Sequence, residues 1–265
     1  MPAVAVVGHV EWVEFIAVSR LPRSGDIVHA HEHFARAAGG GGVASAVLAE
    51  LGAEVDFFCA LGDDVHGHAA ADELTRRGVR LHVAWRGRPT RRAVTMLDER
   101  NERSIVTIGE RLEPLGSDQL DWDRMAAADG VYFTAGDSAA LHRARAAGVL
   151  VASPRGRAAL QDGPGIDALI YSRDDDDERQ WARRVADRVR LLVETQGADG
   201  GAWSGESQGS WEATEPPGPP RDSYGCGDSF AAGFTHALSD GGSVAEAAAL
   251  GAECGARTLT RPGAP

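Results

Sequence analysis

The sequence contains no lysine, so all 27 of its Lys-or-Arg side chains are arginines. This absence excludes the lysine of a Walker A phosphate loop and any mechanism that starts from a lysine Schiff base. A cation that meets a phosphate group in this protein must therefore be an arginine or a metal ion.

Cysteine is also scarce, and Cys59, Cys226 and Cys254 lie far apart in the sequence. An odd number at this spacing fits neither a disulfide framework nor a zinc-ligand motif, so we expect a reducing compartment. The N-terminal segment lacks the basic and apolar regions of a secretory signal, and no later apolar run is long enough to span a bilayer. A cytoplasmic location is therefore expected.

The chain lacks a dense basic stripe, and its formal net charge is -12. Such a surface repels phosphodiester backbones and anionic lipids, so neither nucleic acid nor a membrane is an expected partner. With 265 residues and 43% hydrophobic content, the chain can bury one large core. We expect a single domain that spans residues 1–265.

Short apolar segments alternate with helix-like segments along most of the chain. The predicted strands are residues 3–7, 55–61, 130–134, 149–153, 168–171 and 191–195, and the predicted helices are residues 43–51, 67–77, 138–147, 175–189, 228–238 and 244–258. Residues 11–34 and 93–108 form extended segments, the second with a hairpin turn at 99–102, and residues 205–220 form a strand with flanking loops. This alternation predicts a doubly wound, mainly parallel sheet.

The clearest local motif is a glycine turn before a helix, in which Gly225, Cys226 and Gly227 precede Asp228 and the apolar residues 229–238. A helix N-terminus with flexible backbone presents unpaired N–H groups and a positive dipole to an anion. Asp228 would repel that anion unless it has a role of its own, such as accepting a hydroxyl proton during phosphoryl transfer. On spacing alone, a glycine-rich loop with an aspartate N-cap is the simpler interpretation.

Residues 222–228, DSYGCGD, resemble the carboxy-terminal signature of the ribokinase (PfkB) family and depart from it only at Cys226. Residues 39–46, 51–53 and 60–67 are similar to the amino-terminal signature of that family. Weaker matches lie at residues 21–26, 195–200 and 260–263, so the resemblance spans the whole chain.

The resemblance implies an α/β fold, with a ribokinase-like three-layer α/β/α Rossmann-like core and a small β-sheet lid formed by segments near 19–38 and 90–108. It implies an ATP-dependent phosphotransferase that moves the γ-phosphoryl group to a hydroxyl of a sugar or nucleoside-like molecule. The implied cofactors are ATP and Mg²⁺, with a monovalent cation as a further candidate. A lid excludes water during transfer, and a homodimer through the lid is also expected.

By the same resemblance, Asp228 is expected to be the general base, and the N–H groups of Gly225, Cys226 and Gly227 the anion hole. The expected nucleotide-binding residues are Asp222, Ser223, Thr195, Gly197 and Gly200. The expected substrate-binding residues are Val13, Gly39, Gly40, Val43 and Arg92, and the candidate residue of the metal network is Asp175.

Val13 and Val43 stand where sugar-binding members of the family have an aspartate and an asparagine that hold substrate hydroxyls. Valine cannot form those hydrogen bonds, so the contacts are absent unless Glu11, Glu14 or Ser45 replaces them. These losses leave a second function open, a non-catalytic nucleotide- or metabolite-binding protein of the same fold.

Several of these positions also have purely structural interpretations. Ser172 and Asp175 fall on the family's Asn-x-x-Glu segment, but they could equally cap a helix whose first turn is acidic. The positions from Thr195 to Gly200 could form an ordinary flexible turn after a strand.

Two groups outside the signatures also carry expectations. His29, His31 and His33 share one face of a strand and could bind zinc, but a polar lid face is the simpler interpretation because no fourth ligand is identifiable. Arg91, Arg92 and Arg111 are the best-placed cations for phosphate, and Arg92 is the chosen candidate.

Cys226 is expected to be moderately reactive, since the helix N-terminus favours its thiolate and Asp228 opposes it. The alternative is that it is a small buried residue in the place of alanine.

Overall fold

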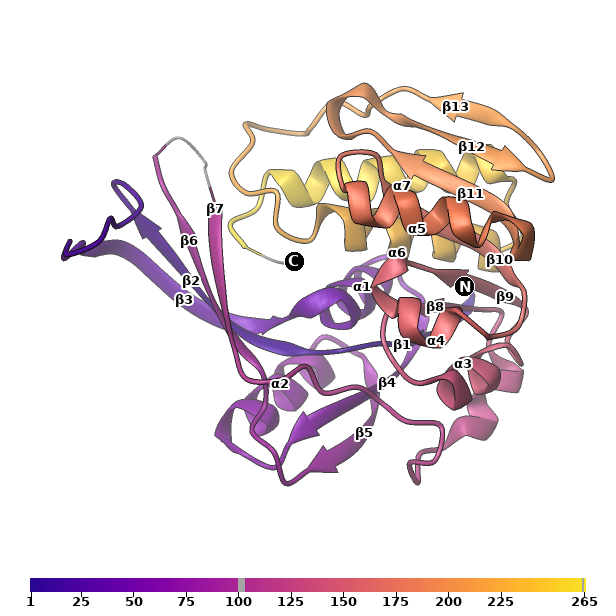
Figure 1. The fold of residues 1–265 in the computed structure, drawn as a ribbon, viewed down its shortest axis with the longest axis horizontal. Coiled ribbons are helices and arrows are strands. Elements are labelled where there is room, and N and C mark those ends of the chain that lie inside the picture. Colours follow the sequence, from indigo (N-terminus) through magenta and orange to yellow (C-terminus); the bar gives the residue numbers. More distant parts are fainter. Residues whose placement is uncertain (100–102, 264) are drawn as a thin grey trace.

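The computed structural model describes residues 1–99, 103–263 and 265. Its main sheet has nine strands in the order β13-β12-β11-β10-β9-β8-β1-β4-β5 (Figure 1). The parallel strands are β1 (Ala3–Val7), β4 (Glu54–Gly62), β5 (Arg80–Arg86), β8 (Gly130–Phe133), β9 (Val149–Ala152), β10 (Ile166–Ser172) and β11 (Val189–Thr195), and the antiparallel edge strands are β12 (Gly201–Gly205) and β13 (Gly209–Trp211). The predicted parallel sheet is confirmed.

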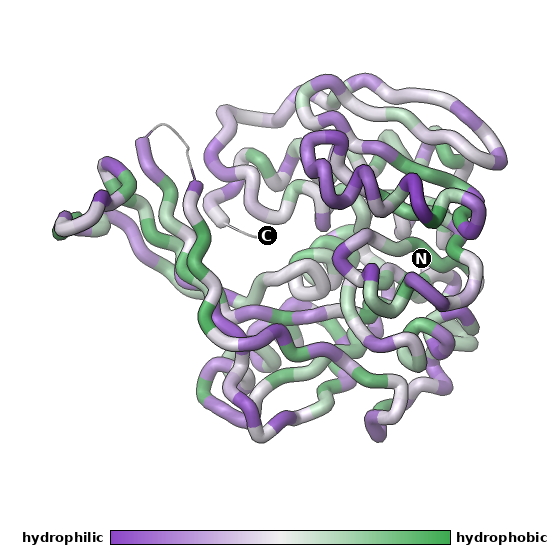
Figure 2. The backbone as a smooth tube through the Cα atoms, viewed as in Figure 1, coloured by the Kyte–Doolittle hydropathy of each residue, from purple (hydrophilic) through white to green (hydrophobic). Residues whose placement is uncertain are grey.

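Helices cover both faces of this sheet. One face carries α1 (Gly39–Glu50), α2 (Val65–Arg76), α6 (Cys226–Ser239) and α7 (Val244–Leu259), and the other carries η1 (Trp122–Ala127), α3 (Ser138–Ala144), α4 (Arg157–Leu160) and α5 (Asp176–Arg184). Side chains alternate along a strand, so Val4 and Val6 pack on the first face, whereas Ala5 and Val7 pack on the second. Figure 2 shows the apolar residues along the central strands and the polar ones along α5. The three-layer α/β/α prediction is confirmed.

A second sheet of four strands, which we call the lid, projects from the core at the left of Figure 1. Its order is β3 (Ala30–Ala38), β2 (Glu11–Val18), β6 (Arg92–Leu97), β7 (Arg103–Ile108). Strand β2 lies before the predicted lid segment 19–38. Most of the predicted hairpin turn 99–102 lies outside the described residues.

The helix α1 begins at Gly39, four residues before the predicted start at Val43. The absence of side chains permits close packing of its first turn: a Cβ on Gly41 would lie 2.7 Å from the ring of Phe57 on β4, and a Cβ on Gly8, after β1, would lie 3.0 Å from the Cα atom of Gly41. A propensity argument treats a glycine run as a loop, whereas here tertiary packing makes it helical.

Other bounds also differ from expectation. The predicted helix 175–189 is shorter in the structure, because a 3₁₀ turn, η3 (Ala186–Arg188), follows α5. The strand β5 was not predicted. Two further 3₁₀ turns, η2 (Pro154–Gly156) and η4 (Gly197–Asp199), follow β9 and β11 after one intervening residue.

His29, His31 and His33 are exposed on and before β3. Among the described residues there is no group of three or more His, Cys, Asp or Glu side chains arranged to hold a metal ion. His33 instead lies 3.6 Å from the carboxylate of Glu14 on the neighbouring strand. All three histidines therefore lie on an exposed, polar part of this sheet and of the loop before it.

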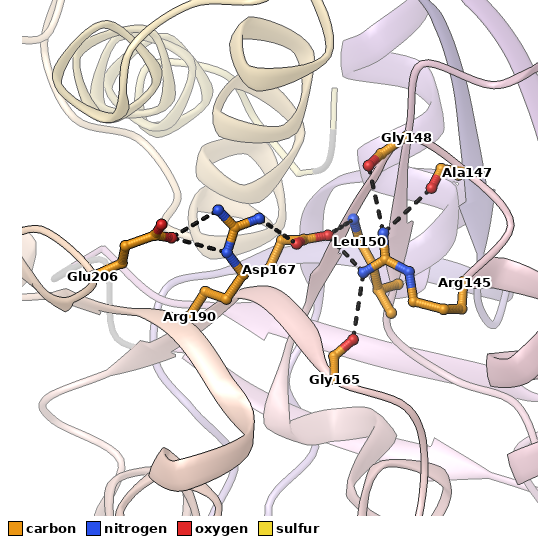
Figure 3. A network of polar contacts seen from close by, with 8 residues as sticks. All are labelled: Arg145, Ala147, Gly148, Leu150, Gly165, Asp167, Arg190 and Glu206. Carbon is orange, nitrogen blue, oxygen red and sulfur yellow. Dashed lines mark hydrogen bonds and ion pairs between the residues drawn. The ribbon is translucent and has the colours of Figure 1, made fainter.

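An ion-pair network links the amino-terminal ends of β9, β10 and β11 (Figure 3). At its centre, the carboxylate of Asp167 accepts hydrogen bonds from Arg145 (2.6 Å), the Leu150 N–H (2.7 Å) and Arg190 (3.1 Å). Arg190 also pairs with Glu206 at 2.7 Å. The network holds the strands at the end opposite to the carboxyl-end turns.

In the described part of the chain, no helix is long and apolar enough to cross a membrane.

Candidate active site

The helix α6 starts at the predicted phosphate turn. Its N-cap residue, Gly225, has a φ of 77°, a conformation that glycine adopts without strain, and no side chain of the described residues caps this end. Within the turn, the Cys226 N–H donates to the Ser223 carbonyl at 3.3 Å, and the Ser229 N–H donates to the Gly225 carbonyl at 2.8 Å. Gly227 and Asp228 line a cavity of about 350 Å³.

This cavity lies at the carboxyl ends of β8, β9, β10 and β11, the edge where parallel α/β sheets bind ligands. Its lining comes from segments far apart in the sequence: Tyr132, Ser153, Arg155, Ile170, Tyr171, Ser172, Asp174, Asp175, Glu178, Thr195, Gly227 and Asp228. A cavity of about 380 Å³ at residues 116–123 and Arg143 contains none of the predicted site residues.

The two family-like signatures meet at Asp228, which is only 7% exposed. A Cβ on Gly40 would lie 3.0 Å from the Oδ1 atom of Asp228, so only glycine allows this approach without a shift. The Gly39 N–H donates to the Tyr224 hydroxyl at 3.3 Å, and the Gly40 N–H lies 3.4 Å from Nε2 of His9. The predicted residues Gly39 and Gly40 therefore adjoin the predicted base.

His9 and Glu11 lie beside these glycines, and both are buried. Burial lowers the pKa of His9 well below its ordinary value, and the positive charges of Arg111, Arg155 and Arg91 lower it further, so the ring is neutral. Its Nδ1 atom has no hydrogen-bond partner among the described residues.

In the same surroundings, the pKa of Glu11 shifts in the opposite direction to that of His9. Burial raises its pKa, and Arg91, Arg111 and Arg155 oppose that rise, whereas Asp228 adds to it. The Nε atom of Arg91 lies 3.2 Å from its carboxylate. These charges indicate that Arg91, Arg111 and Arg155 lie around one site together with Asp228.

Arg155 lies in the η2 turn after β9, between two carboxylates. Its Nη1 atom is 3.7 Å from Asp228, and its Nε atom is 3.9 Å from Glu178. The charge of Asp228 raises the pKa of Arg155, against the effect of burial. Sequence reasoning missed this residue, although an arginine at the carboxyl end of a predicted strand in a lysine-free chain was a usable signal.

Asp175, the candidate metal residue, is the N-cap of α5 and accepts a hydrogen bond from the Glu178 N–H at 3.0 Å. Glu178 turns its carboxylate back to the Ser172 N–H at 3.1 Å. Burial raises the pKa of Glu178, the Ser172 N–H and Arg155 oppose this, and Asp175 and Asp228 add to it. Glu178 thus lies among the charges of the site. Sequence reasoning missed this residue.

The predicted substrate residues Val13 and Val43 are 0% and 1% exposed and belong to the main core cluster. Val43 packs under the phosphate turn, since its Cγ1 atom would lie 3.1 Å from a Cβ on Gly225. Arg92 is the first residue of β6, and the neighbouring Arg91 is the one that pairs with Glu11.

Of the three candidate replacements for the missing polar contacts, only Glu11 lies at the site. Glu14 faces His33 on the lid, and the buried Ser45 hydroxyl donates to the Gly42 carbonyl at 2.9 Å.

The predicted nucleotide-binding residue Asp222 is buried, and its carboxylate has three partners within the described residues. Its carboxylate pairs with Arg103 of β7 at 3.1 Å and accepts from the N–H groups of Tyr224 (2.9 Å) and Gly263 (3.1 Å). Ser223 is exposed. Asp222 therefore shapes the turn and connects it to the lid.

Thr195 lines the cavity, and its hydroxyl donates to the Tyr171 carbonyl at 3.3 Å. Gly197 and Gly200 follow it in the η4 turn with φ values of 56° and 82°. A Cβ on Gly200 would lie 2.1 Å from the Trp211 carbonyl, so the turn needs glycine there. The lining of the cavity contains Thr195 but neither glycine.

A buried carboxylate in the first turn of a helix, at the carboxyl edge of a parallel sheet, is an arrangement suited to phosphate-ester chemistry. The chain belongs to the pfkB family of carbohydrate kinases, whose model matches residues 1–153 and 166–265.

The chain is 30% identical over 283 residues to the ATP-dependent ribose-1-phosphate kinase of Halopiger xanaduensis, covering 100% of this chain and 94% of that protein. Among solved structures, Arabidopsis thaliana ribokinase with ribose and ATP has a TM-score of 0.79 at 22% identity and covers 99% of this chain and 94% of that one. Cryptococcus neoformans ribokinase with ADP has a TM-score of 0.75 at 22% identity, with 100% and 96% coverage. Both structures agree with the fold.

Proposed function

We propose that this protein is an ATP-dependent kinase that transfers the γ-phosphoryl group to a hydroxyl of a sugar-type acceptor, with Asp228 as general base. The observation that carries the proposal is the position of Asp228, in the first turn of α6, against Gly40 and on the wall of the cavity. A base there can accept a proton from a hydroxyl held over the two glycines, while the helix N-terminus faces the phosphate.

In the proposed reaction, the acceptor oxygen bonds to the γ-phosphorus as the bond between that phosphorus and the β–γ bridging oxygen breaks. The hydroxyl proton goes to Asp228, and the electron pair of the broken bond leaves with ADP. The free N–H groups of the α6 N-terminus stabilise the negative charge of the phosphoryl oxygens. The lid sheet excludes water, which would otherwise compete with the acceptor.

Magnesium fits the carboxylates on the cavity wall, because Mg²⁺ retains several waters and needs few protein oxygens. Asp174, Asp175, Glu178 and Asp228 all contribute to that wall. Glu178 is the best placed of the first three, since Asp175 is committed to capping α5. When bound with ATP, the metal would neutralise phosphate charge, and these side chains would orient its waters.

The acceptor we propose to test first is ribose 1-phosphate, on the basis of the relative from Halopiger. The buried, apolar Val13 and Val43 remove two polar contacts to a neutral sugar, and the positive charges of Arg91, Arg111 and Arg155 all act on Glu11 and His9. An anionic acceptor suits such surroundings better than free ribose. A cytoplasmic location and a homodimer through the lid stay predictions.

The test is ADP release from ATP and Mg²⁺ with ribose 1-phosphate, ribose and a set of nucleosides as acceptors. Asp228→Asn should lower turnover by roughly 10²-fold or more, the scale of general-base catalysis, with little change in nucleotide affinity. Asp240→Asn, at the carboxyl end of the same helix, is the matched control and should behave like the wild type. Nucleotide binding without turnover on any acceptor would instead indicate the non-catalytic function.

A further inference from the structure

Three arginines, Arg91, Arg111 and Arg155, act on the site, and of these three Arg155 is the one that lines the cavity of about 350 Å³. Its guanidinium donates none of the side-chain hydrogen bonds found among the described residues, since both of its ion-pair distances, 3.7 and 3.9 Å, exceed hydrogen-bond length. Half of its side chain is exposed, 50%. A guanidinium has five N–H donors, so this one, which lies near two carboxylates, still has donors for a ligand.

The other two arginines have closer carboxylate partners, and these partners do not line the cavity. Arg91 lies 3.2 Å from Glu11, and Arg111 lies 2.5 Å from Glu113. Arg111 also donates to the backbone carbonyl of Arg155 at 3.3 Å, which helps to fix the segment that carries it.

The position of Arg155 distinguishes the two phosphates that it could meet. It shares the cavity wall with Thr195, Ser172 and Gly227, which lie at the ends of β10 and β11 and at the start of α6. The acceptor-side residues His9, Glu11, Gly39 and Gly40 do not line this cavity. The γ-phosphoryl group has to lie between the α6 N-terminus and the oxygen that Asp228 deprotonates, and Arg155 reaches that point.

We propose that Arg155 is the catalytic cation of this lysine-free kinase, contacting the non-bridging oxygens of the γ-phosphoryl group during transfer. This inference rests on the proposed function and adds a side-chain charge to the backbone anion site. In the structure, Arg155 lies 3.7 Å from Asp228 and 3.9 Å from Glu178. ATP exchanges these carboxylates for phosphate oxygens, which leaves Asp228 available to the acceptor hydroxyl.

Two measurements test the role. In binding experiments without acceptor, Arg155→Ala should weaken ATP about 10-fold more than ADP, because only ATP carries the γ-phosphate. In turnover experiments, the same variant should lose on the order of 10²- to 10³-fold in kcat, as expected for a cation that stabilises transferring phosphate. Arg155→Lys should recover part of the loss, since a point charge replaces a planar fork, and added guanidinium should partly rescue Arg155→Ala.

Arg157→Ala is the matched control: it removes the same charge two residues away, at an exposed site outside the cavity lining. It should leave both readouts unchanged. Thermal melting of Arg155→Ala, Arg155→Gln and Arg155→Lys identifies any variant that fails to fold, and the folded ones are then compared.

An unchanged ATP-to-ADP affinity ratio in the folded variants, with the loss confined to KM of the acceptor, would assign Arg155 to an acceptor phosphate and overturn the proposal. The binding readout is independent of turnover. If the wild type phosphorylates no acceptor but Arg155 still discriminates ATP from ADP, the proposed function fails while the γ-phosphate contact stands.

Discussion

At the scale of single residues, Cys226 combines a phosphate-turn position with a suppressed thiolate. Burial raises the pKa of the thiol to about 11, Asp222 and Asp228 add to the rise, and Arg103 and the Cys226 backbone N–H oppose it. The helix N-terminus that favours a thiolate is therefore outweighed by burial and by two carboxylates. The structure thus indicates a less reactive thiol than the moderate reactivity expected from the sequence.

The alkylation rate of Cys226 by iodoacetamide at pH 7.5 should be at least about 10-fold below that of a free cysteine, and should keep rising with pH up to the range of its raised pKa. ATP with Mg²⁺ should slow it further, and Cys226→Ala should remain active. Mass spectrometry of the labelled peptides measures each site. Cys59, fully buried with a pKa raised to about 12, is the internal control and should stay unlabelled. A rate that levels off near neutral pH would contradict this assignment.

At the scale of elements, Asp167 joins three neighbouring strands at their amino-terminal ends (Figure 3). Burial alone would raise its pKa, but the Leu150 N–H, Arg145 and Arg190 together hold the pKa below its ordinary value. A carboxyl whose folded-state pKa is depressed stabilises the fold above its unfolded-state pKa. That stability is lost as pH falls through the folded value.

Asp167→Asn should therefore reduce the free energy of unfolding at pH 7 by on the order of 2 kcal/mol, since it weakens the charged hydrogen bonds from Arg145 and Arg190. The difference from the wild type should shrink as the pH is lowered through the range in which Asp167 becomes protonated. Urea denaturation at several pH values measures both effects. Asp162→Asn, an exposed aspartate of the preceding loop, is the control. An equal loss at pH 7 and at pH 3 would rule out ionisation as the source.

The elements were largely predictable because their signals are local. Apolar runs such as 3–7 and the caps of α2 and α7 depend on nearby residues. The start of α1 was not predictable, since the helicity of Gly39 to Gly42 comes from contacts with Phe57 and Asp228, which are distant in sequence.

The same contrast, between signals from neighbouring residues and contacts between residues distant in sequence, applies to the site residues. A motif placed Gly225 to Asp228 correctly on a helix N-terminus, because the signature is contiguous. Counting from landmarks assigned Val13 and Val43 to substrate contacts, and this assignment stays a prediction; the structure places both side chains inside the core. Arg155 and Glu178 have no motif, and only the meeting of β9, α5 and α6 brings them to Asp228.

At the scale of the whole molecule, the lid and the core meet at the phosphate turn. Arg103 of β7 pairs with Asp222, its guanidinium lies 5.6 Å from the centre of the Tyr224 ring, and Phe15 of β2 packs edge-on against the same ring at 5.1 Å. The lid thus contacts the residues that shape the nucleotide turn, and its position is coupled to the site where water must be excluded.

Arg103→Ala should therefore loosen the lid without unfolding the core, because Asp222 keeps its hydrogen bonds from Tyr224 and Gly263. The expected result is a several-fold rise in KM for the acceptor and a larger share of ATP lost to water, with the free energy of unfolding changed by only about 1 kcal/mol. The ratio of inorganic phosphate to phosphorylated acceptor, measured at saturating ATP, reports this coupling directly. Arg20→Ala removes an arginine whose ion-pair partner, Asp26, lies on the same lid loop, so it should leave the ratio unchanged. If Arg103→Ala also leaves that ratio at the wild-type value, contact between β7 and the phosphate turn does not control access of water to the transferring group.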